Sequence, residues 1–232
     1  KSKVKNKSKK VLFGDSVAKQ LFDSKTTSDT INSLTCNQAI SLVGHYILLN
    51  NYLSAGNQVD TVYFIFRPRT FQNNLDQVYS YHYFLKPFYK KENYQFFTET
   101  VHKQIAKLPY YKFSQFPSVL TSNWAPVVPP EPEVDDMFLS PLSTEYLQKI
   151  KNLARQYNFK LIILPTPMNV VYKKDVDSYN RQPIKDNGFE EEFKNYFENI
   201  IYLDNKYFSD SSHLDEPAVY TELYKKKFLN WH

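Results

Sequence analysis

The sequence has few of the residues that build disulfides and metal centres. Cys36 is its only cysteine, which excludes a disulfide within the chain and leaves the redox compartment undetermined. The five histidines are scattered without the spacing of metal ligands, so we expect no metal site, and no motif indicates another cofactor. The chemistry to look for is therefore that of the side chains alone.

The body of the protein also lacks an excess of basic charge. The formal net charge is +5, but six of the 29 lysines and arginines precede residue 11, which leaves 23 basic residues against 24 acidic ones. A nucleic-acid-binding fold normally carries a basic stripe, so we expect no nucleic-acid partner. We interpret residues 1–9 as a basic, disordered leader and residues 10–232 as a single domain with one insertion.

No stretch of 18 consecutive apolar residues occurs, so we expect no membrane span in this sequence. The first residue is lysine rather than methionine, which leaves room for an upstream signal peptide or anchor. The location therefore stays open, and an extracytoplasmic or membrane-anchored protein is one alternative.

The most informative stretch runs from Val11 to Phe22. Val11, Leu12 and Phe13 have the bulk of a buried parallel strand, Gly14 permits a sharp turn, and the apolar residues that follow recur at helical spacing. Ser16 would then stand between the carboxyl end of a strand and the amino end of a helix, where open α/β sheets place their sites. The alternative is that Ser16 only caps the helix.

A second informative stretch lies near the other end of the chain. Asp210 precedes His213 by three residues in a loop after the short apolar run 200–203. The carboxylate can turn back onto Nδ1 of the imidazole, which leaves Nε2 to take a proton from a serine. The alternatives are that His213 is a surface histidine and that Asp210 caps a turn. The occurrence of both stretches in one chain makes these alternatives less favoured.

With these two blocks, Gly14-Asp15-Ser16 and Asp210-Ser211-Ser212-His213, the sequence resembles the SGNH/GDSL hydrolase superfamily. The resemblance implies a flavodoxin-like, three-layer α/β/α sandwich around a parallel sheet. It also implies that Ser16 is the nucleophile, His213 the general base and Asp210 the carboxylate that orients it. The order Ser, Asp, His along the chain is that of the family.

Two further family blocks are altered. The second usually reads Asn-x-Gly, with the glycine N–H donating to the oxyanion; here Asn37 is followed by Ala39 at the glycine position, so we expect the N–H groups of Ser16 and Ala39 to form the oxyanion hole. In the third block, Arg69 stands where the family has an asparagine. It could hold an oxyanion, bind an anionic substrate or pair with a surface acid.

We expect α/β architecture with five parallel strands, each followed by helix, and right-handed crossovers. The strands are expected at residues 11–13, 30–36, 59–66, 160–165 and 200–203. Helices are expected at about 37–53, 75–89, 95–108, 141–157, 190–197 and 217–228. Residues 71–140 fit no strand–helix repeat and read as a helical, aromatic-rich insertion after the third strand, with an extended linker marked by Pro126, Pro129, Pro130 and Pro132. Its aromatic residues either stack on sugar rings or pack the insertion's own core.

These observations predict a serine-type esterase that removes O-acyl groups, O-acetyl above all, from a carbohydrate or cell-surface glycan through an acyl-enzyme. Asn37 and Arg69 are the expected substrate-binding residues. The choice of an acylated glycan as partner comes from the resemblance. Two alternatives stay open: an O-acyltransferase that moves the acyl group onto a polysaccharide, and a non-catalytic glycan-binding or assembly protein on the same fold.

Overall fold

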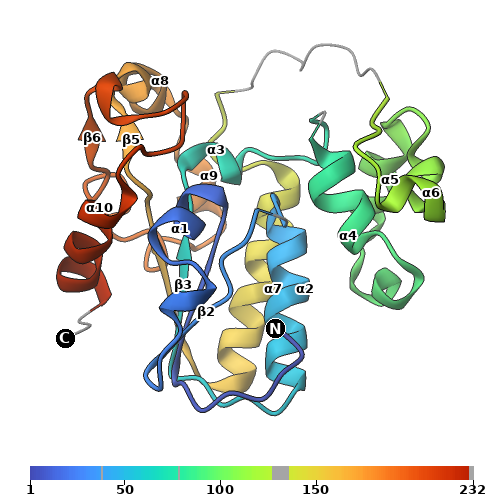
Figure 1. The fold of residues 1–232 in the computed structure, drawn as a ribbon, viewed down its shortest axis with the longest axis horizontal. Coiled ribbons are helices and arrows are strands. Elements are labelled where there is room, and N and C mark those ends of the chain that lie inside the picture. Colours follow the sequence, from blue (N-terminus) through green and yellow to red (C-terminus); the bar gives the residue numbers. More distant parts are fainter. Residues whose placement is uncertain (38, 78, 127–135, 230–232) are drawn as a thin grey trace.

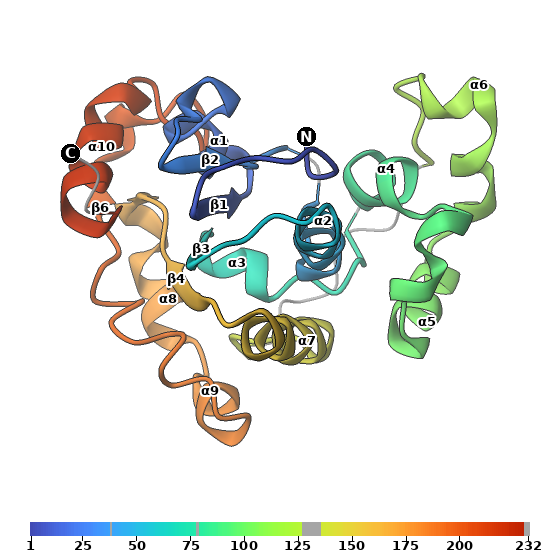
Figure 2. The same ribbon diagram turned by 90° about the horizontal axis from the view of Figure 1, so that it is seen from below.

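A parallel sheet of four strands organises the fold (Figures 1 and 2). The computed structural model describes residues 1–37, 39–77, 79–126 and 136–229. The strands lie in the order β2-β1-β3-β4 and comprise β1 (Lys10–Gly14), β2 (Ile31–Ser33), β3 (Thr61–Ile65) and β4 (Lys160–Leu164). Gly14 pairs with Ile65, and Ile65 pairs with Leu164. The carboxyl ends of these strands therefore meet at one edge of the sheet.

Different helices cover the two faces of this sheet, which makes the chain an α/β protein (Figure 2). Val11 and Phe13 of β1 belong to the core under α2 (Leu42–Ser54) and α7 (Pro141–Tyr157). Leu12 belongs to a second core, under α1 (Ser16–Leu21) and α10 (Pro217–Tyr224). Because successive strand residues point to opposite faces, the uninterrupted apolar run of β1 follows from burial on both sides.

The expected fifth strand does not join the central sheet. Residues Tyr202–Leu203 form β6, which pairs in parallel with β5 (Met168–Asn169) in a separate two-stranded sheet. Pro165 ends β4 and has no N–H to donate, so the chain leaves the ladder and forms a new pairing three residues later. The central sheet of the described residues therefore has four strands, and the prediction of five was wrong.

The long helices agree with the sequence pattern except at the start of α2. Helix α7 occupies the expected residues, and the Ser140 hydroxyl caps it by accepting from the N–H of Ser143 at 3.0 Å. Helix α2 begins at Leu42 rather than near Asn37. Ala39 has a φ of 59°, a left-handed conformation that a helix cannot contain, so the segment before Leu42 forms a loop.

Short helices fill the chain between β3 and α7 (Figure 1). They are α3 (Pro68–Phe71), the π-helical turn Tyr81–Leu85, α4 (Lys86–Phe88), the 3₁₀ turns Lys91–Phe96 and Tyr111–Gln115, α5 (Glu99–Lys107) and α6 (Pro117–Leu120). The continuous helix expected at 75–89 is absent from the described part of this segment. The helix expected from residue 95 begins only at Glu99, where Thr98 caps it. Three of the four prolines of the expected linker, at positions 129, 130 and 132, lie outside the described residues.

The carboxyl-terminal third differs from expectation at residues 190–197. Helices α8 (Lys173–Ser178) and α9 (Gln182–Asp186) precede this segment, and the segment itself forms turns. Phe189, Phe193 and Tyr196 are buried at the spacing that suggested a helix, but Asn195 has a φ of 58° and interrupts it. Further 3₁₀ and π-helical turns lie at Ser24–Thr26, Val170–Tyr172, Asn205–Tyr207 and Lys225–Leu229. None of the helices in the described ranges has the length and apolar character that crossing a membrane requires.

Residues 4–9 contact the fold where the sequence suggested a disordered leader. The side-chain amide of Asn57 donates to the carbonyl of Val4 at 3.1 Å, and its oxygen accepts from the N–H of Asn6 at 2.6 Å. Ser8 is buried and donates from its hydroxyl to the carbonyl of Ser28 at 2.7 Å. The polar residues between the lysines therefore hold the segment, while the lysines before residue 10 remain exposed.

Candidate active site

The residues singled out in the sequence gather at the carboxyl-terminal edge of the sheet. Ser16 follows β1, Asn37 and Ala39 follow β2, and Arg69 lies in α3 after β3. His213 reaches the same edge from the loop between β6 and α10. A pocket of about 270 Å³ is lined by Ser16, Asn37, Arg69 and His213 together.

The turn between β1 and α1 leaves the Ser16 side chain available to the pocket, because Gly14 forms the close packing and Asp15 caps the helix. A Cβ added to Gly14 would lie 2.2 Å from the Cβ of Ala18 and 2.7 Å from the carbonyl oxygen of Ile65, so only glycine allows this close approach. Asp15 is the N-cap of α1, and its Oδ1 accepts from the N–H groups of Val17 and Ala18 at 3.1 and 3.3 Å. The sequence left open whether Ser16 is only a cap; the structure gives that position to Asp15.

Asp15 also connects two segments of the site. Its Oδ2 accepts a hydrogen bond of 3.0 Å from the hydroxyl of Thr70 in α3, and both side chains are buried. This bond fixes the first turn of α1 against the helix that carries Arg69. The serine and the arginine segment are therefore held by one buried carboxylate.

Ser16, His213 and Asp210 form a continuous hydrogen-bonded chain. The hydroxyl oxygen of Ser16 lies 2.9 Å from Nε2 of His213, and Nδ1 of the same ring lies 2.7 Å from Oδ2 of Asp210. The three residues are separated by up to 197 positions in the sequence. This is the geometry in which a carboxylate orients an imidazole and the imidazole accepts a proton from a hydroxyl.

Asp210 is held in its ionised form by the loop that it stabilises. Oδ1 accepts from the backbone N–H groups of His213 and Ser212, at 2.8 and 2.7 Å, while Oδ2 contacts the His213 ring. These hydrogen bonds lower the pKa of Asp210 to about 2. The bond from the backbone N–H of His213 has the largest effect, the bond from its ring follows, and the bond from the N–H of Ser212 contributes less. The carboxylate therefore remains charged well below neutral pH.

Gln20 positions the histidine loop, and the sequence analysis did not identify it. Its side-chain oxygen accepts from the N–H of Leu214 at 3.0 Å, and its amide donates to the Leu214 carbonyl at 3.2 Å. Gln20 lies on α1, four residues after Ser16 and thus on the same side of the helix. One side chain therefore sets the loop of His213 in register with the helix of Ser16. A glutamine on a half-buried helix carries no sequence signal for this contact.

The expected oxyanion hole is only partly present. The N–H of Ser16 stands at the start of α1, where the N–H groups have no partner within the helix. The N–H of Ala39 donates instead to the carbonyl of Tyr83 at 2.9 Å, so it cannot hold an oxyanion in this structure. Ala39 packs so closely on α2 that a Cβ added to Gly44 would lie 2.7 Å from its Cα. The side chains of Asn37 and Asn73 line the same pocket and carry amide donors.

Arg67 is a second functional candidate that the sequence analysis missed. Because Gly14 pairs with Ile65, the residues two positions further on, Ser16 and Arg67, leave neighbouring strands at the same level. One guanidinium nitrogen of Arg67 donates to the hydroxyl of Ser212, next to His213. Arg67 and the exposed Arg69 both line the pocket of Ser16. Counting along the family motif favoured Arg69, whereas the pairing register would have indicated Arg67.

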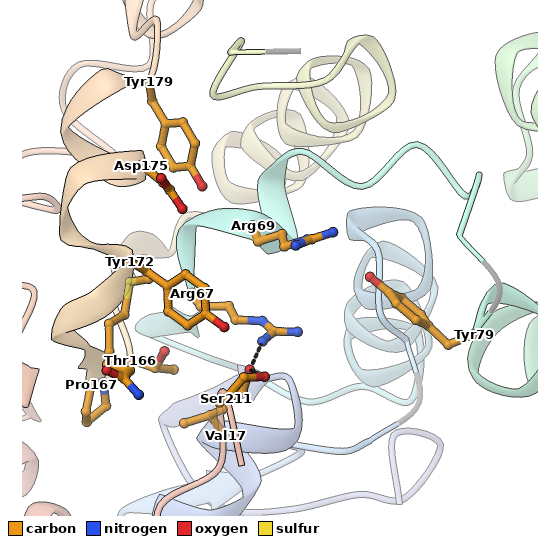
Figure 3. Close-up of a pocket in the computed structure, with 13 residues that line it drawn as sticks. Val17, Arg67, Arg69, Tyr79, Thr166, Pro167, Tyr172, Asp175, Tyr179 and Ser211 are labelled. Carbon is orange, nitrogen blue, oxygen red and sulfur yellow. Dashed lines mark hydrogen bonds between the residues drawn. The ribbon is translucent and has the colours of Figure 1, made fainter. Parts of the chain in front are cut away.

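A second pocket, of about 330 Å³, is drawn in Figure 3. Arg67, Arg69 and Tyr79 line both pockets, so the two pockets are neighbours that share these side chains. Of the aromatic residues in the insertion, Tyr79 and Tyr83 line the pocket of Ser16. Others, such as Phe84, are buried, but in the main core that also contains residues of α2 and β3 rather than in a core of the insertion's own.

Comparisons with family models, curated proteins and solved structures found no match to this chain. In the described ranges, no group of three or more histidine, cysteine, aspartate or glutamate side chains is arranged to hold a metal ion. The site must therefore be judged from its own geometry.

Proposed function

We propose that the protein is a serine-type esterase that removes acyl groups, with acetate as the expected group, from hydroxyls of a carbohydrate or cell-surface glycan. The observation that carries the proposal is the hydrogen-bonded chain from Ser16 through His213 to Asp210. Its position at the carboxyl edge of a parallel sheet, after a strand–glycine–helix turn, also supports it. We further propose that the fold is the three-layer α/β/α sandwich of the SGNH/GDSL superfamily, with residues 71–140 as an insertion.

The geometry suits acyl transfer in two steps. His213 takes the Ser16 proton on Nε2 as the oxygen attacks the ester carbonyl, and it then gives this proton to the departing alcohol. The ionised Asp210 holds Nδ1–H and stabilises the imidazolium that forms. A water molecule, activated by the same imidazole, then attacks the acyl-enzyme and releases the carboxylic acid.

Charge on the carbonyl oxygen needs donors other than Ala39. The Ser16 N–H is one, and the guanidinium groups of Arg67 and Arg69 stand in the same pocket, with the amides of Asn37 and Asn73. A single donor of this kind contributes about 3 kcal/mol to transition-state stabilisation in serine hydrolases. We propose that a side-chain donor takes the place of the second backbone N–H.

One observation favours an O-acyltransferase as the second candidate. The pocket beside the Ser16 pocket is large enough to hold an acceptor sugar next to the acyl-enzyme. Hydrolase and transferase use the same three residues and differ only in whether water or a sugar hydroxyl accepts the acyl group. Adding sugar acceptors to an assay separates them, because a transferase diverts product from free acetate to acetylated sugar.

A different observation favours a non-catalytic glycan-binding or assembly protein. The Ala39 N–H is occupied by Tyr83, which removes one expected oxyanion donor. The intact chain from Ser16 to Asp210 argues against this candidate, because binding alone does not require an oriented imidazole beside a serine.

Hydrolysis of a small activated acetate ester tests the proposed function. We expect Ser16→Ala to fold normally and to lose on the order of 10³-fold or more of the turnover, because members of such a triad act as one unit. His213→Ala should lose a similar factor. Ser118→Ala, which changes an exposed serine of α6, is the matched control and should keep full turnover. Equal turnover in wild type and Ser16→Ala would refute the esterase proposal.

A further inference from the structure

The second pocket is lined by the kinds of residue that bind a ring-shaped ligand with a negative charge. It is lined by residues that follow β3, β4 and β5 and by the loop of His213. Its volume of about 330 Å³ is at the lower end of the range of roughly 300–1,000 Å³ found for small-molecule sites. Arg67 and Arg69 supply positive charge, and Tyr79, Tyr172 and Tyr179 supply aromatic faces and hydroxyls.

The arrangement of charge in this pocket is asymmetric. The guanidinium groups of Arg67 and Arg69 extend in the same direction, toward the side on which Tyr79 lies (Figure 3). Asp175, the one acidic residue among the described residues of the lining, stands beside Tyr179 on the opposite wall (Figure 3). An anion between the arginines and Tyr79 therefore meets two positive charges on its own side and the carboxylate only across the pocket.

The electrostatic influence of both arginines reaches across the pocket. Burial raises the pKa of Tyr179, while the charges of Arg69 and Arg67 oppose this rise and the charge of Asp175 adds to it. The hydrogen bond from Arg67 to Ser212 uses one guanidinium nitrogen and leaves other N–H groups of the same fork for a ligand. Arg67 therefore contacts the histidine loop and the pocket at once.

One buried polar atom in the pocket wall lacks a partner. Oγ1 of Thr166, which lies just beyond β4, makes no hydrogen bond with any group in the described part of the chain. Leaving a buried hydroxyl without a partner destabilises the folded protein. A hydroxyl of a bound sugar, or a water carried by it, would satisfy Thr166.

We propose that this pocket binds a carboxylate-bearing sugar unit, such as a uronic acid residue, next to the unit whose ester is cleaved at Ser16. This inference rests on the proposed function in taking the substrate to be an acylated glycan. The planar guanidinium fork matches a carboxylate in two parallel hydrogen bonds, and a tyrosine face packs against a sugar ring. Because Arg67, Arg69 and Tyr79 border both pockets, a unit bound here places its neighbour at Ser16.

Binding to the Ser16→Ala variant tests the inference without catalysis. The probes are a galacturonic acid trisaccharide and its uncharged methyl ester, measured by calorimetry at low ionic strength. We expect the charged trisaccharide to bind at least tenfold more tightly than the ester, and added salt to reduce this preference. Arg69→Gln should lower the ratio of the two affinities at least fivefold. Arg69→Lys should lower it less, because lysine keeps the positive charge but not the planar guanidinium fork.

Arg155→Gln, which changes an exposed arginine of α7 remote from the pocket, is the matched control and should keep the full preference. Equal affinity for the two trisaccharides, or a preference unchanged in Arg69→Gln, would overturn the inference. Failure of the proposed function would be distinguishable from failure of this inference. In that case the protein would bind the charged trisaccharide preferentially but hydrolyse no ester.

Discussion

The contact between Gln20 and Leu214 makes a quantitative prediction about how the site is held. Replacing Gln20 with alanine removes the bonds of 3.0 and 3.2 Å that connect α1 to the loop of His213. Each bond contributes about 0.5–1.5 kcal/mol, so the loss is about 1–3 kcal/mol. For a chain of this length, that corresponds to a fall of about 2–12 °C in melting temperature.

The same substitution should also slow catalysis, by an amount of similar size in free energy. Without Gln20, the loop keeps the bond from Arg67 to the Ser212 hydroxyl and the bond within the loop from the Ser209 N–H to the His213 carbonyl, at 2.9 Å. A displacement of about 1 Å between catalytic groups can reduce the rate about 100-fold. We therefore expect Gln20→Ala to lower kcat for a small ester by 10- to 100-fold with little change in KM, because the substrate pocket is untouched.

Steady-state kinetics and thermal melts on the same samples check this prediction. Gln148→Ala is the matched control, since Gln148 makes an exposed bond of 3.3 Å to Asn152 on α7, away from the site. A Gln20→Ala protein with wild-type kcat would refute the reasoning, even if its melting temperature fell. A rise in KM at constant kcat would also contradict a positioning role.

Three further predictions concern stability. The pKa of Asp210 in the folded state, about 2, lies below its ordinary value of 3.8, so its contribution to stability is present above about pH 4 and fades as the pH falls toward 2; the difference in melting temperature between wild type and Asp210→Asn should shrink over that window. Deleting residues 1–8 should lower the melting temperature by several degrees, through lost bonds to Asn57 and Ser28, whereas neutralising the exposed lysines should not. Gly44→Ala should lower the free energy of unfolding, measured by urea denaturation, by about 1–3 kcal/mol, because the added methyl group would clash with Ala39.

Local signals in the sequence account for what could be predicted. The apolar run of β1, the glycine after it and the short distance between Asp210 and His213 each constrain a few neighbouring residues. These constraints were enough to indicate the strand–turn–helix around Ser16 and the carboxylate–imidazole pair. That the serine and the histidine meet was implied by the family resemblance, because the loop of His213 follows β6, which lies outside the central sheet.

The rest of the site depends on contacts between distant segments. The Ala39 N–H is taken by Tyr83, a residue of the insertion, and no pattern near residue 39 signals that bond. The pairing of β6 with β5 follows from the break at Pro165, which the sequence showed as the end of a strand but not as a change of sheet. Arg67 can be recognised as a neighbour of Ser16 only from the register between β1 and β3, which composition and periodicity do not provide.

Labelling with a fluorophosphonate probe tests most directly whether Ser16 is an activated nucleophile. The probe reacts with a serine whose proton is accepted by a neighbouring base, and mass spectrometry of the digested protein locates the adduct. We predict a single adduct on the peptide that contains Ser16, with labelling abolished in Ser16→Ala and strongly slowed in His213→Ala. Absence of labelling in the wild-type protein, or an adduct that persists in Ser16→Ala, would contradict the assignment of Ser16 as the nucleophile.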